Sequence, residues 1–145
     1  MKPDQLLKIA LLTGGILTTA IGIAHIFIPS LGYSDNIVVN MNTEIRNYFD
    51  YLATYAICAF LLTLGFLSIY FSRLTYPRAS FVVCSTLSVL WIARLVLELK
   101  YPVEIPLFVM QRPTVVLLPV IAFIATLYSV ASVVYVKQAK GLNNG

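Results

Sequence analysis

Charged side chains are scarce in this sequence. Only 11% of its 145 residues are Asp, Glu, Lys or Arg, while 59% are hydrophobic. An average soluble domain has about 25% charged residues. A chain of this composition cannot cover its surface with polar groups, so it does not belong to the class of soluble globular domains. We therefore expect an integral membrane protein.

Residues that commonly bind metals are also few. The chain has one histidine, His25, and two cysteines, Cys58 and Cys84, without a Cys-x-x-Cys spacing. One histidine among scattered carboxylates does not supply the four ligands of a zinc site, so we expect no metal centre. A haem could take an axial histidine only from His25, either from a single chain or from both chains of a dimer. The two cysteines fall at different depths of different predicted helices, which argues against a disulfide.

Short catalytic signatures are absent. The sequence has no glycine-rich phosphate loop, no His-Glu-x-x-His helix and no Ser–His–Asp spacing. No basic patch with interleaved aromatics is present either, so we expect no nucleic-acid partner. Active sites embedded in membranes often lack short signatures. These absences therefore leave catalytic residues and cofactors undetermined.

Four long hydrophobic runs dominate the sequence. They predict membrane-spanning helices over residues 6–29, 51–71, 79–99 and 114–136. Each run is long enough to cross roughly 30 Å of hydrocarbon at about 1.5 Å per residue. We predict a single all-α domain, residues 1–145, that forms an up-down-up-down four-helix bundle. The first run is too long for a signal peptide, and we expect it to be retained.

The connections and the tail carry further expectations. The short segment "SRLTYPR" predicts that the second and third helices are antiparallel neighbours, and the tail "KQAKGLNNG" is expected to fray. Lys and Arg are unevenly divided between the two sides of the predicted bundle. One side has Lys2, Lys8, Arg73, Arg78, Lys137 and Lys140, and the other has Arg46, Lys100 and Arg112. The positive-inside rule therefore predicts that both termini are cytoplasmic.

Small and polar residues follow one face of each predicted helix. In lipid, helices associate by close packing, so such faces mark the helix interfaces. The four sets are Gly14, Thr18, Gly22 and His25; Asp50, Thr54, Cys58, Leu61, Gly65 and Ser68; Ser80, Cys84, Ser88, Trp91, Arg94 and Glu98; and Ala122, Ala125, Ser129 and Ser132. We expect a compact bundle with a partly polar axis, and a kink of the last helix at Pro119.

Two charges interrupt the third hydrophobic run. Arg94 and Glu98 lie four residues apart in its outer half. A lone charge in the membrane costs at least ~2.5–3.5 kcal/mol, and a pair of opposite charges can neutralise itself. Other ionisable and aromatic side chains are predicted at the same depth. The expected ligand-binding cluster consists of His25, Asp50, Tyr55, Trp91, Arg94, Glu98 and Arg112.

Two interpretations of this cluster stay open. It is either a buried ion-pair network that fixes helix register, or a pocket in which an arginine meets an anionic or carbonyl group. Our leading hypothesis is a membrane bundle whose outer-leaflet pocket binds a small amphipathic molecule, such as a lipid or a quinone. The alternatives are an accessory subunit of a larger membrane complex or homo-oligomer, and a membrane enzyme that uses His25 and Glu98 as acid and base.

Two segments and the size of the chain suggest a family. "GIAHIFIP" (22–29) ends a glycine-rich first helix, and "FLLTLGFLS" (60–68) lies in the second. In these features the chain resembles small DoxX-like four-helix bacterial membrane proteins, and the similarity would cover most of its length. The resemblance implies a helical bundle in the inner (cytoplasmic) membrane of a bacterium. It also implies an accessory role, since some members accompany quinone-linked or redox systems, and it transfers no catalytic residue.

Overall fold

Four long helices make up the described part of the chain. The structure, a computed structural model, describes residues 2–27, 43–74, 76–102 and 113–143. The helices are α1 (Pro3–His25), α2 (Thr43–Arg73), α3 (Pro77–Lys100) and α4 (Thr114–Asn143). Each contains a stretch that is long and apolar enough to cross a membrane. This is the architecture of a multi-pass helical membrane protein, as the hydrophobic runs predicted.

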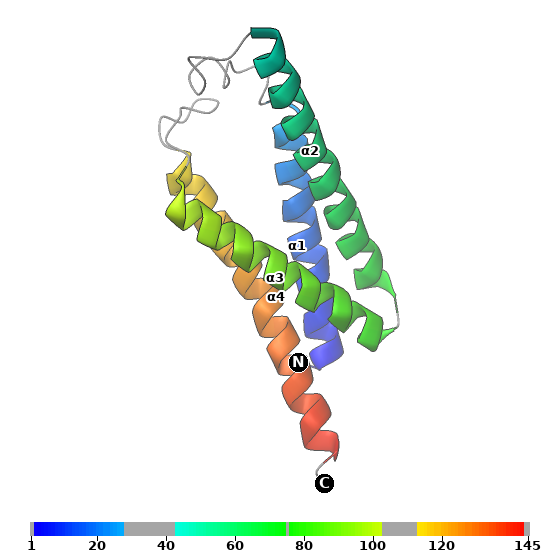
Figure 1. The fold of residues 1–145 in the computed structure, drawn as a ribbon. Coiled ribbons are helices and arrows are strands. Elements are labelled where there is room, and N and C mark those ends of the chain that lie inside the picture. The colour runs from blue at the N-terminus through cyan, green and yellow to red at the C-terminus, as the bar shows by residue number, and fades with distance from the viewer. Residues whose placement is uncertain (1, 28–42, 75, 103–112, 144–145) are drawn as a thin grey trace.

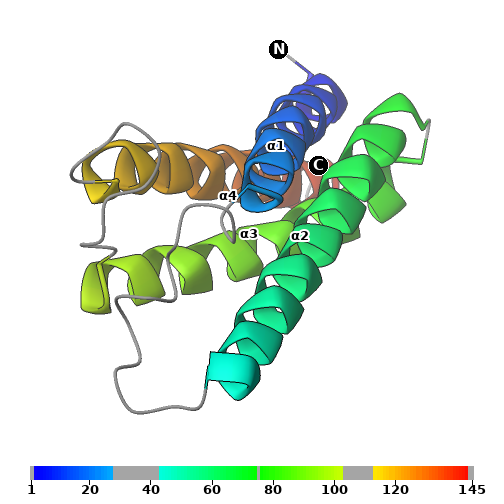
Figure 2. The same ribbon diagram turned by 90° about the horizontal axis from the view of Figure 1, so that it is seen from above.

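The helices associate as two pairs. Figure 1 shows α1 beside α2 and α3 beside α4, with both chain termini at one end of the molecule. The pairs meet mainly where α1 packs on α4 and diverge toward the opposite end, where α1 ends and α4 begins (Figures 1 and 2). We call this the open end, and the end with the termini the closed end.

Glycines set the separation of α1 and α2. A Cβ atom on Gly65 would lie 2.9 Å from the backbone nitrogen of Thr19 and 3.0 Å from the carbonyl oxygen of Gly15. A Cβ on Gly15 would lie 2.9 Å from the carbonyl oxygen of Gly65. The two backbones are therefore in contact at this level, which only residues without a side chain permit.

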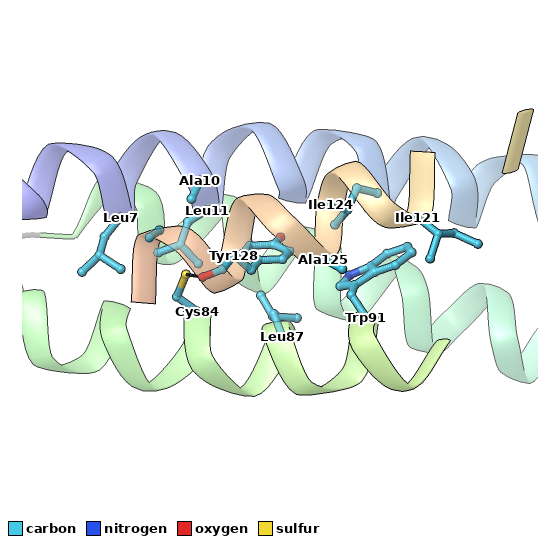
Figure 3. Close-up of a cluster of buried hydrophobic side chains, with 11 residues drawn as sticks. Leu7, Ala10, Leu11, Cys84, Leu87, Trp91, Ile121, Ile124, Ala125 and Tyr128 are labelled. Carbon is cyan, nitrogen blue, oxygen red and sulfur yellow. Dashed lines mark hydrogen bonds between the residues drawn. The ribbon is translucent and has the colours of Figure 1, made fainter. Parts of the chain in front are cut away.

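The hydrophobic core lies between α1, α3 and α4. Its fully buried side chains include Leu7, Leu11, Leu87, Ile124 and Tyr128. Figure 3 shows Tyr128 of α4 between the side chains of α1 and α3. In contrast, α2 lies at the margin of the bundle. Only 17% of the membrane-spanning apolar stretch of α2 is buried, whereas 39% of the corresponding stretch of α1 is buried.

The predicted inward faces are confirmed by burial in the described side chains. Gly14, Thr18 and Gly22 are buried in α1, and Thr54, Cys58, Gly65 and Ser68 are buried in α2. In α3, the buried residues are Ser80, Cys84, Leu87, Ser88, Trp91 and Glu98. In α4, Ala125 and Ser132 are buried, while Ala122 and Ser129 are half-buried. Spacing by three and four residues thus identified the packed face of each helix, although Arg94 of the α3 set is exposed and His25 and Leu61 are half-buried.

The structure refines the expectations about the helices. The helices α2 and α3 adjoin, as predicted, but have the least extensive contact of the adjoining pairs, because their short connection holds them together at one end only. The tail that was predicted to fray is helical as far as Asn143, and α2 begins at Thr43, eight residues before the predicted span. Hydropathy detects only the part of a helix that crosses the hydrocarbon, so it misses polar turns beyond that part. The helix α4 runs through Pro119 as one helix.

Candidate functional site at the open end of α3

An ion pair lies near the last turn of α3. The guanidinium Nη2 of Arg94 is 2.6 Å from the carboxylate Oε2 of Glu98. The Glu98 side chain is fully buried, whereas 43% of the Arg94 side chain is exposed. Within this pair, the acid is enclosed by the protein and the base presents part of its charge to the surroundings.

The start of α4 explains how Glu98 is accommodated. The hydroxyl of Thr114, the first residue of α4, donates to Glu98 Oε1 at 3.5 Å. A helix N-terminus carries a partial positive charge that stabilises a nearby carboxylate. At the C-terminal end of its own helix, Glu98 would meet the opposite polarity. The N-terminus of α4 offsets that penalty. This arrangement depends on how α4 packs on α3, so local sequence patterns do not predict it.

Trp91 lies one helical turn before Arg94 and belongs to the core. It is 4% exposed. Figure 3 shows its indole beside Ala125 and Ile121 of α4. Trp91 was predicted to belong to the ligand-binding cluster, and the structure packs its ring in the hydrophobic core.

His25 and Tyr55 belong to the other helix pair. The Nδ1 atom of half-buried His25 is 2.8 Å from the carbonyl oxygen of Ile21, so Nδ1 carries the donated hydrogen. Tyr55 is exposed and stacks on Tyr51, with 6.0 Å between ring centroids. Figure 1 shows the end of α1 at a distance from the ends of α3 and α4.

The structure thus brings together part of the predicted cluster. It unites Trp91, Arg94 and Glu98 on α3, and it holds His25 and Tyr55 on the α1–α2 pair. Arg112 lies outside the described residues, as does the side chain of Asp50. The chemistry available at the open end of α3 is recognition of an anionic or carbonyl oxygen by a guanidinium.

A buried hydroxyl network was missed by the sequence reasoning. Ser68 of α2 donates to the carbonyl oxygen of Leu11 at 2.6 Å, and the hydroxyl of Tyr128 lies 2.9 Å from Ser68 Oγ. Since Ser68 has a single hydrogen, Tyr128 is the donor to Ser68. In the same buried region, Thr18 of α1 donates to the carbonyl oxygen of Gly14 at 2.7 Å. The sequence signal for Tyr128 was its spacing of three residues from Ala125 and four from Ser132, which places it on the predicted packed face of the last helix.

A ladder of neutral polar groups joins α3 to α4. Cys84 Sγ donates to the carbonyl oxygen of Tyr128 at 3.4 Å. Ser88 and Ser129 are 2.6 Å apart, and because Ser129 donates to the carbonyl oxygen of Ala125, Ser88 is the donor of that pair. Both cysteines are free and buried. The ladder satisfies polar atoms within the protein, as a membrane interior requires.

The chain was compared with protein families, curated proteins and solved structures. No family model, curated protein or solved structure matches the chain. In the part of the chain that the structure describes, no three His, Cys, Asp or Glu side chains gather into a metal-binding group. Among the described residues of the predicted cluster, Arg94 combines a charge with a partly exposed side chain, so it is the residue best placed to bind a ligand.

Proposed function

We propose that the protein is a small multi-pass membrane protein whose outer-leaflet polar site binds a small amphipathic or lipid-like molecule. The observation that carries the proposal is the asymmetry of the ion pair, with a fully buried Glu98 and a partly exposed Arg94. A buried carboxylate holds the guanidinium in one place. Among the described residues, the remaining guanidinium donors have no partner, so they can face an anionic or carbonyl oxygen.

The surroundings of Arg94 favour a ligand with an apolar part. Leu97, one turn farther along α3, is exposed, and Leu90, one turn back, is half-buried. A molecule whose polar head meets Arg94 would therefore lay its apolar tail against leucine side chains. Quinones and lipids both have this division of polar and apolar parts.

The placement in the membrane is part of the proposal. We propose that the helices cross the bilayer up-down-up-down with both termini in the cytoplasm of a bacterium, in its inner membrane, as in the DoxX-like proteins that the sequence resembles. The uneven distribution of Lys and Arg supports this orientation. It places Arg94 and Glu98 in the outer half of the membrane. Reporter fusions at the N- and C-termini test the orientation, and an external reporter at either terminus contradicts it.

Native mass spectrometry of gently solubilised protein tests the binding site. We expect a small molecule to remain on the wild type and on Lys100→Leu, which removes another cation at the open end. We expect it to be lost from Arg94→Leu and weakened in Arg94→Lys, which keeps the charge but not the planar donor arrangement. Equal retention by Arg94→Leu would reject the proposal. Arg94→Lys keeps the test valid if Arg94→Leu does not fold.

An accessory role in a larger complex or homo-oligomer is a second candidate. The observation that favours it is a row of small exposed residues on α2: Ala56, Ala59 and Thr63, at spacings of three and four. The other small-residue faces are used inside the protein, and this one is not. Cross-linking from Thr63→Cys in native membranes tests it, with Val130→Cys on the exposed face of α4 as the control. Cross-links at both positions alike would contradict a specific interface.

No observation favours the enzymatic alternative. Glu98 pairs with Arg94, and the His25 ring bonds within its own helix. The ends of their helices lie apart in Figure 1, whereas an acid–base pair must reach one reacting atom.

A further inference from the structure

A second candidate binding site lies at the closed end of the bundle. A cavity of about 210 Å³ is lined by Asp4, Leu7 and Lys8 of α1, by Leu74, and by Pro77 and Ser80 of α3. Figure 1 shows the first turn of α1 close to the connection between α2 and α3. The cavity is smaller than the roughly 300–1,000 Å³ of pockets for drug-sized molecules. It has room for several waters or for a compact polar group, since a water takes about 30 Å³ of liquid volume.

The charges of the lining are balanced. Asp4 and Lys8 lie four residues apart on α1, and neither takes part in a salt bridge within the described part of the chain. The Lys8 side chain is half-buried, about 7.5 Å along the helix axis from its first residue. A lysine at this depth reaches the level of lipid headgroups by extending its chain toward water.

The remaining lining is suited to a lipid. Leu7 is buried, and Leu74 and Pro77 add further apolar surface where the spanning segments begin. Ser80 is nearly buried and gives its hydroxyl hydrogen to the carbonyl oxygen of Phe71, so its oxygen can only accept a further hydrogen bond. The lining therefore offers one cation, one anion and one acceptor beside apolar surface.

We propose that this cavity binds the zwitterionic headgroup of a membrane phospholipid. Lys8 binds the phosphate, and Asp4 with Ser80 Oγ binds an ammonium group. An anionic headgroup without an ammonium would satisfy Lys8 but would be repelled by Asp4. A headgroup that carries both charges complements the whole lining. This site is distinct from the one at Arg94 and rests on different residues.

Lipid binding to delipidated protein in a non-ionic detergent tests the proposal by native mass spectrometry. Phosphatidylethanolamine is titrated against the wild type, Lys8→Gln, Asp4→Asn and the control Lys137→Gln, an exposed lysine at the same end. A charge-assisted hydrogen bond contributes about 1.5–3 kcal/mol, and 1.4 kcal/mol is tenfold in affinity. We therefore expect at least about tenfold weaker binding for Lys8→Gln and Asp4→Asn, and unchanged binding for Lys137→Gln.

Two further ligands test whether the site recognises a zwitterionic headgroup and whether it requires a lipid. Phosphatidylglycerol, an anionic lipid, is expected to bind more weakly than phosphatidylethanolamine and to gain affinity from Asp4→Asn. Tighter binding of phosphatidylglycerol to the wild type would overturn the zwitterionic assignment. If water-soluble phosphoethanolamine binds as tightly as phosphatidylethanolamine, the proposal that the ligand is a membrane lipid would be overturned. Equal affinity of all four proteins for phosphatidylethanolamine would overturn the site itself, whatever Arg94 variants do at the open end.

Discussion

The contact between α1 and α2 leads to a sharp prediction for Gly65→Ala. The new Cβ would lie 2.9 Å from the backbone nitrogen of Thr19 and 3.0 Å from the carbonyl oxygen of Gly15. Backbone atoms in helices cannot rotate away, so the helices must separate. Overpacking of this kind costs about 1–3 kcal/mol. The better helix propensity of alanine returns about 0.8–1 kcal/mol. We expect a net destabilisation of up to about 2 kcal/mol.

The same helix pair provides a matched control, Gly22→Ala. A Cβ on Gly22 would lie 3.2 Å from Leu61 Cβ and from Leu62 Cγ and Cδ2, which are side-chain atoms. A leucine side chain can shift by a few tenths of an ångström, so the overpacking cost is small. The propensity gain is the same in both variants and cancels in the comparison. We therefore expect Gly22→Ala to be about 1–3 kcal/mol more stable than Gly65→Ala.

Unfolding by sodium dodecyl sulfate in mixed micelles, followed by circular dichroism, measures the difference between the two variants. The comparison is valid if both transitions are reversible and have the same dependence on detergent composition. Equal stabilities, or a Gly65→Ala protein more stable than Gly22→Ala, would refute the backbone contact between α1 and α2. The pairing of helices described for this fold would then be wrong at its closest point.

Three further predictions use the same micelles. Tyr128→Phe removes one interhelical hydrogen bond, worth about 0.6 and at most about 1.7 kcal/mol in membranes, and a loss above 3 kcal/mol would show a larger role. Arg94→Leu is expected to destabilise the protein by up to about 3 kcal/mol because Glu98 loses its cation. The double variant Arg94→Leu, Glu98→Gln is expected to regain most of that stability, and a double variant less stable than Arg94→Leu would contradict this explanation. Cys58 and Cys84 are expected to resist a maleimide in the folded protein and to react, two per chain, after unfolding, whereas reaction of fewer than two thiols without reductant would indicate a disulfide.

The sequence was sufficient to predict the helices and their packed faces. Long apolar runs give the spans, since the membrane interior allows only internally hydrogen-bonded helices over such lengths. Spacing by three and four residues gives the faces, as Ser80, Cys84 and Ser88 of α3 illustrate. These signals are local, so they can be read without knowing which helix packs on which.

The pairing of helices and the composition of the site depend on contacts between distant residues. Gly15 and Gly65 meet across fifty residues, and Tyr128 packs over Gly14. Nothing in the local spacing of either helix specifies its partner. The predicted cluster at the open end assumed that equal depth brings residues together. The two helix pairs diverge, so the end of α1, which carries His25, lies apart from the end of α3, which carries Glu98 (Figure 1).

The polar groups of this protein divide by charge and position, and the division indicates where binding takes place. In the middle of the bundle, neutral hydroxyls such as those of Ser68, Thr18 and Tyr128 bond to one another or to carbonyl oxygens. Such groups hold helices together and have no donor to offer a ligand. Two cations within the spans, Arg94 and Lys8, lie toward opposite ends, and each keeps part of its side chain accessible. A charged ligand group can therefore be met at these two ends, and there we expect substitutions to change binding.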